Sequence, residues 1–312
     1  MKMLVTGGAG FIGSHFVEWT TKNRPEVELV VLDKLTYASV VGKDTVESLG
    51  VPLIVGDIAD PEDVSNAARG VDVIVNFAAE THNDNSIEGP DIFFKTNVIG
   101  TLELVKFASS HDIRFHQIST DEVFGDLPLD STEKFTEDSP YKPSSPYSSS
   151  KAAADHIVRA WVRTYGLRAT ISNCSNNYGP RQHPEKLIPK TINLLAAGER
   201  PVLYGVGENI RDWIHVEDHV SGVWAVLNRG RIGETYLLGG GMELENKAVV
   251  GSIQKAMNVL KEVESEFIVD RLGHDQRYAI DFSKAQAELA WQPMRTSFQG
   301  EIDLIVAQAR LL

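Results

Sequence analysis

The segment VTGGAGFIG, from Val5 to Gly13, constrains the fold of this chain more than any other. An apolar stretch that predicts a buried strand, Lys2–Thr6, leads into it, and a helix-like stretch follows. Gly7, Gly10 and Gly13 recur at three-residue spacing. Glycine allows a tight turn and a close backbone approach to a ligand, and the amides and positive end of the following helix favour phosphate. Because strand, loop and helix come in this order, the segment predicts a dinucleotide-binding loop.

The first half of the chain continues with alternating strand-like and helix-like segments. The strand candidates are short, β-branched and apolar on both faces, as buried parallel strands are. After the first they are Val27–Asp33, Pro52–Gly56, Val71–Phe77, Phe115–Ser119 and Arg168–Asn173. Helices are predicted at Asp91–Ser110 and after Asp60-Pro61, where Asp60 suits the N-cap and Pro61 the first helical position. This alternation predicts an α/β fold with a doubly wound parallel sheet of the Rossmann type.

Beyond about Tyr178 the pattern changes. Prolines come closer together, and glycine-rich turns follow a helix-like run from Leu187 to Ala197. We therefore predict a dinucleotide-binding domain at residues 1–178 and a smaller α/β substrate domain mainly at residues 179–312. Residues 212–239 are expected to return to the first domain.

Composition excludes several classes of partner. The chain has 43 acidic and 30 basic residues and a net charge of −13, so it lacks the electrostatic footprint of a nucleic-acid-binding protein. No apolar run approaches the roughly 20 residues that cross a bilayer, so no membrane partner is expected. Cys174 is the single cysteine, which is typical of a reducing compartment, and we expect a cytoplasmic protein. The 9 histidines are scattered without ligand spacing, so no metal is expected.

An acidic residue follows the glycine loop at the spacing that a nicotinamide dinucleotide requires. Asp33 ends the second strand candidate, where a carboxylate can accept a hydrogen bond from a ribose 2′-hydroxyl. Because a carboxylate repels a 2′-phosphate, NAD is favoured over NADP, although the basic Lys34 stands beside it. Asp57 and Phe77-Ala78-Ala79 end the next two strand candidates, and we expect them near the adenine and the nicotinamide.

A tyrosine and a lysine four residues apart begin a later helix. Ser145 is the expected N-cap, Pro146 the first helical residue and Gly166 the end of the helix. Tyr147 and Lys151 then share one helical face. Since a nearby ammonium favours tyrosinate, we expect the pKa of Tyr147 to be lowered toward a value useful for removing a hydroxyl proton.

The glycine loop with this tyrosine-lysine pair resembles the extended short-chain dehydrogenase/reductase family. Longer segments are similar to one branch of that family, the dTDP-glucose 4,6-dehydratases. These segments are Gly7–His15, Asp33–Ala38, Ala78–Ile87, Ile118–Gly125, Ser175–Pro189, Gly207–His219 and Arg271–Asp281. They are spread over most of the chain, and the resemblance implies a lyase that uses tightly bound NAD and takes a nucleotide sugar, dTDP-glucose, as its substrate.

Within this family, the triplet Thr120-Asp121-Glu122 separates dehydration from epimerisation. An epimerase only removes and returns a hydride, whereas a dehydratase also needs an acid at the leaving hydroxyl and a base at carbon. Two adjacent carboxyl groups in a buried pocket can supply both, because repulsion and desolvation keep one protonated. The resemblance implies that Tyr147, helped by Thr120, takes the C4 hydroxyl proton. It also implies that Glu122 takes the C5 proton while Asp121 protonates the C6 hydroxyl.

The resemblance further implies two sets of binding residues. Those expected to hold NAD are Gly7, Gly10, Phe11, Ile12, Gly13, Asp33, Lys34, Thr36, Asp57, Ile58, Phe77, Ala78, Ala79, Thr96, Tyr147, Lys151 and Asn177. Those expected to hold the nucleotide sugar are Thr81, His82, Thr120, Asp121, Glu122, Asn176, Lys186, Leu187, Tyr204, Arg211, Asn246, Arg271 and His274. Asn83, Asn85 and Val202 depart from the residues usual in the family, which affects contacts around the substrate rather than the chemistry.

Three interpretations of the activity remain after the sequence is read. The first is the dTDP-glucose 4,6-dehydratase, and the second is a nucleotide-sugar 4-epimerase or a dehydratase for another nucleotide. The third, a non-catalytic NAD-binding protein, is disfavoured because Thr120, Asp121, Glu122, Tyr147 and Lys151 all occur together. The sequence does not determine whether the substrate carries thymidine or uridine, since the two differ by methyl contacts worth about 1–3 kcal/mol.

The family resemblance also implies a homodimer. The helices predicted at Asp91–Ser110 and Tyr147–Tyr165 are candidates to pack against their copies as a four-helix bundle. Their apolar residues, which could equally face the sheet, include Phe93, Leu104, Ile157 and Trp161.

Overall fold

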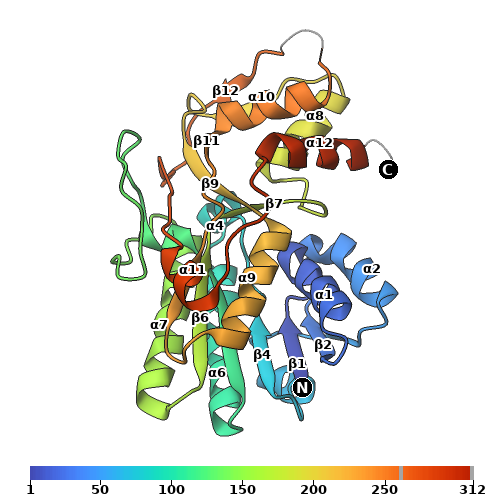
Figure 1. The fold of residues 1–312 in the computed structure, drawn as a ribbon, viewed down its shortest axis with the longest axis vertical. Coiled ribbons are helices and arrows are strands. Elements are labelled where there is room, and N and C mark those ends of the chain that lie inside the picture. Colours follow the sequence, from blue (N-terminus) through green and yellow to red (C-terminus); the bar gives the residue numbers. More distant parts are fainter. Residues whose placement is uncertain (260–262, 310–312) are drawn as a thin grey trace.

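A seven-stranded parallel sheet forms the centre of the larger lobe (Figure 1). The computed structural model describes residues 1–259 and 263–309 of the 312-residue chain. The strand order is β10-β6-β5-β4-β1-β2-β3. From β1 the chain adds strands toward one edge of the sheet, and from β4 it adds them toward the other edge. Such a reversal opens a crevice at the carboxyl ends of the strands, where open α/β sheets bind ligands. The predicted doubly wound α/β fold is confirmed.

Six of the seven strands lie close to their predicted ranges, and only β10 was not predicted from the sequence. The seven are β1 (Lys2–Thr6), β2 (Glu28–Asp33), β3 (Leu53–Val55), β4 (Val73–Asn76), β5 (Arg114–Thr120), β6 (Ala169–Cys174) and β10 (Thr235–Leu238). Alternate residues of a strand point to opposite faces of the sheet. In β1, Met3 and Val5 join one buried cluster, and Leu4 joins another on the opposite face. This double burial explains why the strands are apolar at successive positions.

Helices cover both faces of the large sheet. The helices α1 (Phe11–Asn23), α2 (Val40–Ser48) and α9 (Val216–Arg229) contribute to the first cluster. The helices α3 (Pro61–Ala67), α6 (Thr101–Ser110) and α7 (Pro146–Tyr165) contribute to the second. Asp60 caps α3 by accepting a hydrogen bond from the Glu62 amide at 2.8 Å, as predicted. No helix in the described ranges combines the length and apolar character needed to cross a bilayer.

The segment Asp91–Ser110 is helical as predicted, but it is not one regular α-helix. It consists of α5 (Asp91–Phe93), a π-helical stretch η2 (Phe94–Gly100) and α6. The buried Asn97 lies in the π-helical part, where its side chain pairs with the backbone of Glu80 and donates to Ser150 Oγ at 2.8 Å. These contacts join the loop after β4 to α7. Hydrophobic periodicity does not distinguish the two helix types, so the sequence did not predict this stretch.

A smaller lobe lies above the large sheet in Figure 1. Its strands are β7 (Asn176–Tyr178), β9 (Ile210–His215) and β11 (Glu243–Glu245) in one sheet, and β8 (Val202–Tyr204) and β12 (Glu266–Ile268) in another. Its helices are α8 (Leu187–Ala196), α10 (Asn246–Ala256) and α12 (Phe298–Ala309). Tyr178, Trp213 and Phe298 pack together in its core. Between β9 and β11 the chain returns to the large lobe as α9 and β10, and α11 (Ser283–Leu289) packs beside them.

Candidate active site

The glycine loop follows β1 and leads into α1. Gly7 has a φ of +67°, and a Cβ there would lie 2.5 Å from the backbone nitrogen of Ala78. A Cβ on Gly13 would lie 2.1 Å from the carbonyl oxygen of Gly7. Gly10 occupies the N-cap of α1 without a side-chain cap, so the first amides of that helix are not covered by a side chain. The loop therefore forms a cradle that side chains would fill, with a helix N-terminus facing it, as a diphosphate requires.

Asp33 ends β2 as predicted and lines the same cavity as the loop. Its carboxylate accepts hydrogen bonds from the amide of Ala9 at 3.0 Å, the amide of Leu35 at 2.8 Å and Ser39 Oγ at 2.9 Å. A carboxylate offers about four lone-pair sites, so these three donors orient it and still leave an acceptor for a ribose hydroxyl.

Lys34 does not act against the choice of NAD over NADP. Its ammonium forms an ion pair with Asp57 at 2.9 Å, and Asp57 is also 4.0 Å from the ammonium of Lys95. The charge of Lys34 is thus already matched by a carboxylate of the protein. A 2′-phosphate would have to approach both Asp33 and Asp57, which disfavours it.

All of the residues predicted to hold the dinucleotide line one cavity of about 300 Å³. They are Gly7, Gly10, Phe11, Ile12, Gly13, Asp33, Lys34, Thr36, Asp57, Ile58, Phe77, Ala78, Ala79, Thr96, Tyr147, Lys151 and Asn177. The residues come from the ends of β1 to β4, from the helices beside them and from β7. The donors and the cradle of this cavity fit NAD.

The predicted catalytic residues line the other part of that cavity. β5 ends at Thr120, and the 3₁₀ turn η3 (Asp121–Phe124) carries both carboxyl groups. Tyr147 and Lys151 come from the first two turns of α7, which begins with the predicted Ser145 cap and ends at Gly166 in the left-handed conformation. Two elements far apart in sequence thus bring the acids and the tyrosine-lysine pair together.

The two adjacent acids have different surroundings. Asp121 is fully buried, and its Oδ2 has no hydrogen-bond partner among the described residues. Burial, the neighbouring Glu122 and Asp212 together raise the pKa of Asp121 well above its usual value. Glu122 is only half-buried and accepts a hydrogen bond from Asn83. This arrangement favours the protonated form of Asp121, which lines the cavity.

The expected lowering of the Tyr147 pKa is not what the protein groups produce. Burial and the negative charge of Glu122 raise the pKa of Tyr147 well above its usual value, although hydrogen bonding with Thr120 opposes them. The ammonium of Lys151 donates to the carbonyl oxygen of Ile118 at 2.7 Å. Sequence spacing placed the ammonium on the correct helical face, but it did not reveal desolvation or the carboxylate opposite.

Asp155 is a buried residue of this site that sequence analysis missed. It lies one turn after Lys151 on α7, and its charge supports the protonated form of Lys151 against burial, which lowers the pKa of Lys151. Ser119 Oγ and the Tyr141 hydroxyl donate to Asp155 at 2.7 and 2.8 Å. Its four-residue spacing from Lys151 was the available signal.

The predicted substrate residues outside the Thr120–Glu122 triplet divide into three groups. Thr81, Asn176 and Lys186 line the cavity beside the catalytic residues. The ammonium of Lys186 donates to the Thr81 carbonyl at 3.3 Å and so joins the smaller lobe to the loop after β4. His82 caps the short helix α4 (Asn83–Glu88), and its Nε2 lies 3.6 Å from a carboxylate oxygen of Glu185.

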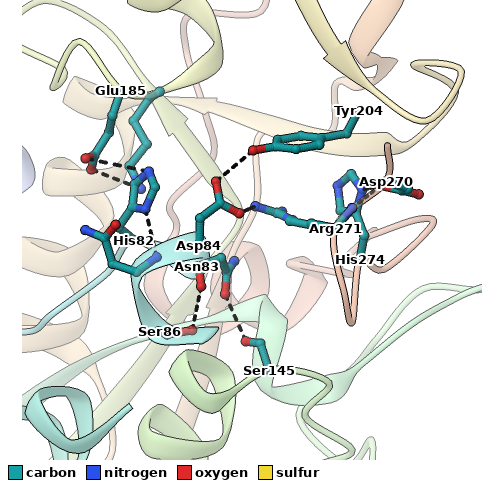
Figure 2. A network of polar contacts seen from close by, with 12 residues as sticks. His82, Asn83, Asp84, Ser86, Ser145, Glu185, Tyr204, Asp270, Arg271 and His274 are labelled. Atoms are coloured by element: carbon teal, nitrogen blue, oxygen red, sulfur yellow. Dashed lines mark hydrogen bonds and ion pairs between the residues drawn. The ribbon is translucent and has the colours of Figure 1, made fainter. Parts of the chain in front are cut away.

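The second group surrounds Asp84, outside the lining of that cavity. Figure 2 shows the Tyr204 hydroxyl and the Arg271 guanidinium both pointing at the Asp84 carboxylate. Tyr204 donates to it at 2.9 Å, and Arg271 lies 3.5 Å from it. His274 Nδ1 hydrogen-bonds Asp270 at 2.6 Å, and its ring meets that of Tyr204 edge to face. Sequence analysis did not assign Asp84 or Asp270 a role.

Three further predicted substrate residues have mainly structural contacts. Arg211 is buried, donates to the backbone carbonyls of Asp275, Gln276 and Ile210, and lies over the Tyr278 ring. Leu187 begins α8 and packs against the core of the smaller lobe, while Asn246 begins α10. Their expected contacts with substrate stay predictions.

Cys174 also lines the cavity, at the end of β6. Burial raises the pKa of its thiol to about 12, and the neighbouring Asp121 acts in the same direction. Since the thiolate is the nucleophile, Cys174 is a small packing residue of the cavity wall. Among the described residues, no group of three histidine, cysteine, aspartate or glutamate side chains could hold a metal ion.

Comparisons with known proteins agree with this geometry. A family model described as GDP-mannose 4,6 dehydratase matches residues 4–303. A dTDP-glucose 4,6-dehydratase of Mycobacterium tuberculosis (strain CDC 1551 / Oshkosh) is 50% identical over 301 residues, which cover 96% of this chain and 90% of the relative. This chain belongs to the 4,6-dehydratases of the extended short-chain dehydrogenase/reductase family.

Solved structures of both 4,6-dehydratases and epimerases are similar to this chain. DesIV, the dTDP-glucose 4,6-dehydratase of Streptomyces venezuelae determined with NAD and dTDP, has a TM-score of 0.93 at 42% identity. The match covers 100% of this chain and 97% of that structure. The UDP-glucose 4-epimerase of Thermus thermophilus, with NAD, has a TM-score of 0.90 at 30% identity, with 99% of each chain covered. The two branches share a fold, so the catalytic residues must distinguish them.

Proposed function

We propose that this protein is a dTDP-glucose 4,6-dehydratase, an NAD-dependent hydro-lyase that forms dTDP-4-keto-6-deoxyglucose. The observation that carries the proposal is the pair Asp121 and Glu122 in one cavity with Tyr147 and the glycine loop. An epimerase has no use for a buried protonated acid beside a second carboxylate. The names of the relatives and the NAD and dTDP of the DesIV structure support the choice of cofactor and substrate.

The chain holds the dinucleotide through backbone and acidic groups. The loop Gly7–Gly13 receives the pyrophosphate, Asp33 accepts from a ribose hydroxyl, and Lys151 lies at the catalytic end. When bound, NAD would accept a hydride from C4 and later return it to C6, so the cofactor has the same oxidation state before and after the reaction. Its positive charge would also favour the tyrosinate form of Tyr147.

Tyr147 acts first, as the base for the C4 hydroxyl proton. The proton passes to its phenolate oxygen as C4 becomes a ketone. Thr120 hydrogen bonding lowers the Tyr147 pKa, and Lys151, held by the Ile118 carbonyl, keeps a positive charge nearby. The Thr120 hydrogen bond opposes the burial and the Glu122 charge, which raise the pKa of Tyr147.

Glu122 and Asp121 then remove water across C5 and C6. The C4 ketone acidifies the C5 proton, which Glu122 takes while the electron pair of that bond forms the C5–C6 double bond. The C6–oxygen bond breaks as Asp121 protonates the leaving hydroxyl, and water departs. The raised pKa of Asp121 provides the proton for this step. After C6 is reduced, a carboxyl group returns a proton to C5.

The label test follows from this sequence of steps. Purified protein with dTDP-glucose carrying deuterium at C4 should give a product lighter by one water, with the deuterium at C6 of the same molecule, as read by mass spectrometry and NMR. Retention of water, or loss of the deuterium to solvent, would contradict the proposal. UDP-glucose and other nucleotide sugars in parallel reactions test the preference for thymidine.

We also propose a cytoplasmic homodimer. Phe93 and Leu104, expected as possible interface residues, are both buried, Phe93 beside the Tyr147 ring and Leu104 in the second core cluster, against which Ile157 and Trp161 also pack. The apolar residues exposed on this segment are instead Ile92, Phe94 and Ile99. They offer an outer face to a four-helix bundle. Sedimentation of wild type and Phe94→Glu should show a dimer and a weakened dimer, whereas a monomeric wild type would contradict the proposal.

A further inference from the structure

Asn83 joins the catalytic carboxylate Glu122 to the start of the helix that carries Tyr147. Its Nδ2 donates to Glu122 Oε2 at 2.8 Å, and its Oδ1 accepts from Ser145 Oγ at 2.9 Å. Figure 2 shows the Asn83 side chain directed toward Ser145. Asn83 is the first residue of α4, and its own carbonyl accepts from Ser86 Oγ at 2.7 Å. One amide thus connects three elements around the site of proton transfer.

The chemistry of its neighbours sets the orientation of this amide. A carboxylate can only accept hydrogen bonds, so the nitrogen of Asn83 must face Glu122. The oxygen then faces Ser145, whose hydroxyl has one proton to donate. That hydroxyl also accepts from the amide of Ser148 as the cap of α7, which leaves its proton free for Asn83. Both ends of the Asn83 amide are therefore matched, and rotating it by half a turn would place two acceptors together.

We infer that Asn83 is a positioning residue for Glu122 in the elimination step. The inference rests on the proposed function, because it assigns Glu122 the C5 proton. Glu122 stands on the four-residue turn η3 and is half-buried, so few contacts restrict its carboxylate. The hydrogen bond from Asn83 selects one orientation of the Glu122 carboxylate. The bond from Ser145 prevents the amide itself from turning.

The contacts of Asn83 indicate that it acts in the elimination step and not in the oxidation of C4. It contacts the base of the second step, whereas Tyr147, the base of the first, lies two residues beyond Ser145 on α7. Loss of Asn83 should therefore slow C5 deprotonation more than C4 oxidation. Isotope effects on each step can show this difference.

The test compares Asn83→Leu, which keeps the branching of the side chain and removes both hydrogen bonds, with the wild type. We expect kcat to fall about 10-fold, because a hydrogen bond to a charged group is lost, with KM little changed. The isotope effect on kcat from substrate deuterated at C5 should rise, and the effect from substrate deuterated at C4 should fall toward unity. The control is Asn66→Leu, at an exposed position of α3 that does not line the cavity.

A second variant, Asn83→Asp, distinguishes positioning from simple support of α4 against α7. It keeps an oxygen for Ser145 and replaces the donor to Glu122 by a second negative charge. The inference predicts that Asn83→Asp is at least as slow as Asn83→Leu. Activity of Asn83→Asp near that of wild type, or a fall in the kcat of Asn83→Leu with unchanged isotope effects, would overturn it. A wild type that does not dehydrate dTDP-glucose would instead refute the proposed function.

Discussion

The two ends of the active-site cavity are built from different materials. At the cofactor end, the contacts come from the backbone of the glycine loop and from Asp33, which local amides hold in place. At the substrate end, side chains from separate elements outside the cavity lining hold one another, as Asp84 holds Tyr204 and Arg271. The first arrangement depends on neighbours in sequence, and the second depends on how two lobes pack.

This difference explains why the residues of the cofactor end could be predicted from the sequence more completely than those of the substrate end. A backbone cradle needs glycine at fixed spacing, which is visible without a structure. A network of side chains needs partners more than 100 residues away, such as Asp84 and Tyr204. All predicted cofactor residues therefore line one cavity, whereas Arg211 is committed to backbone carbonyls.

The largest effect is expected where the two ends meet, at Tyr147. Tyr147→Phe removes the base for the C4 hydroxyl, and we expect kcat to fall about 1000-fold. NAD content after purification should be unchanged, because the glycine loop is untouched. Tyr165→Phe, on the exposed end of the same helix, is the control and should retain full activity. Activity of Tyr147→Phe within tenfold of wild type would remove Tyr147 from the mechanism.

One added methyl group should be enough to weaken NAD binding at the cofactor end. Gly13→Ala places a Cβ 2.1 Å from the Gly7 carbonyl oxygen, so the loop must move away from its cradle. We expect NAD to bind about 100-fold more weakly by calorimetry. Gly251→Ala is the matched control, because its added methyl group meets nothing within 4 Å and lies in the interior of α10. It should leave NAD binding intact and stabilise the fold by about 0.5–1 kcal/mol.

The substrate end should respond in KM rather than in NAD binding. Arg271→Lys keeps the charge and removes the planar fork that suits a carboxylate or a diphosphate. We expect KM for dTDP-glucose to rise about 10-fold, with kcat and NAD affinity little changed. Arg200→Lys, at an exposed site of the same lobe, should have no effect. An equal loss of NAD affinity in Arg271→Lys would show that the two ends are not separate.

The smallest expected effect concerns stability where β9 meets the large lobe. Burial raises the pKa of Asp212 to about 7, so the folded state binds a proton that the unfolded chain releases near pH 4. Stability is therefore lost as pH rises through this interval, at about 1.4 kcal/mol per pH unit. Asn in place of Asp212 can still accept from the Met242 amide.

Asp212→Asn should accordingly raise the Tm by about 4 °C at pH 8 and leave it nearly unchanged at pH 4. Scanning calorimetry across this range measures the difference between the two proteins. Asp130→Asn, at an exposed position, provides the comparison. A constant Tm difference at every pH would show that Asp212 does not titrate as its burial implies.

The sequence predicted most of the large lobe because its signals are local. Apolar strands, the Asp60 cap and the Ser145 cap each arise from neighbouring residues, and the structure has all of them. The π-helical stretch around Asn97 and the contact of Asn83 with Glu122 arise from tertiary packing. The periodicity of the sequence does not encode such contacts, so they are visible only in the folded structure.

The electrostatics of the site show the same limit. The adjacency of Asp121 and Glu122 suggested that one acid stays protonated, and burial acts on Asp121 in that direction. The Tyr147 pKa lies opposite to the expectation, because burial and the charge of Glu122 raise it. Spacing along a helix locates a charge, but only the fold determines how dry its surroundings are.

In the proposed mechanism, Tyr147 serves the oxidation of C4, whereas Asp121 and Glu122 serve only the elimination of water. The direct measurement is a single turnover of the double variant Asp121→Asn/Glu122→Gln with dTDP-glucose, quenched and examined by mass spectrometry. The account predicts a 4-keto sugar that has lost two hydrogens and still carries its C6 oxygen. Release of water by the double variant at the wild-type rate would contradict the account.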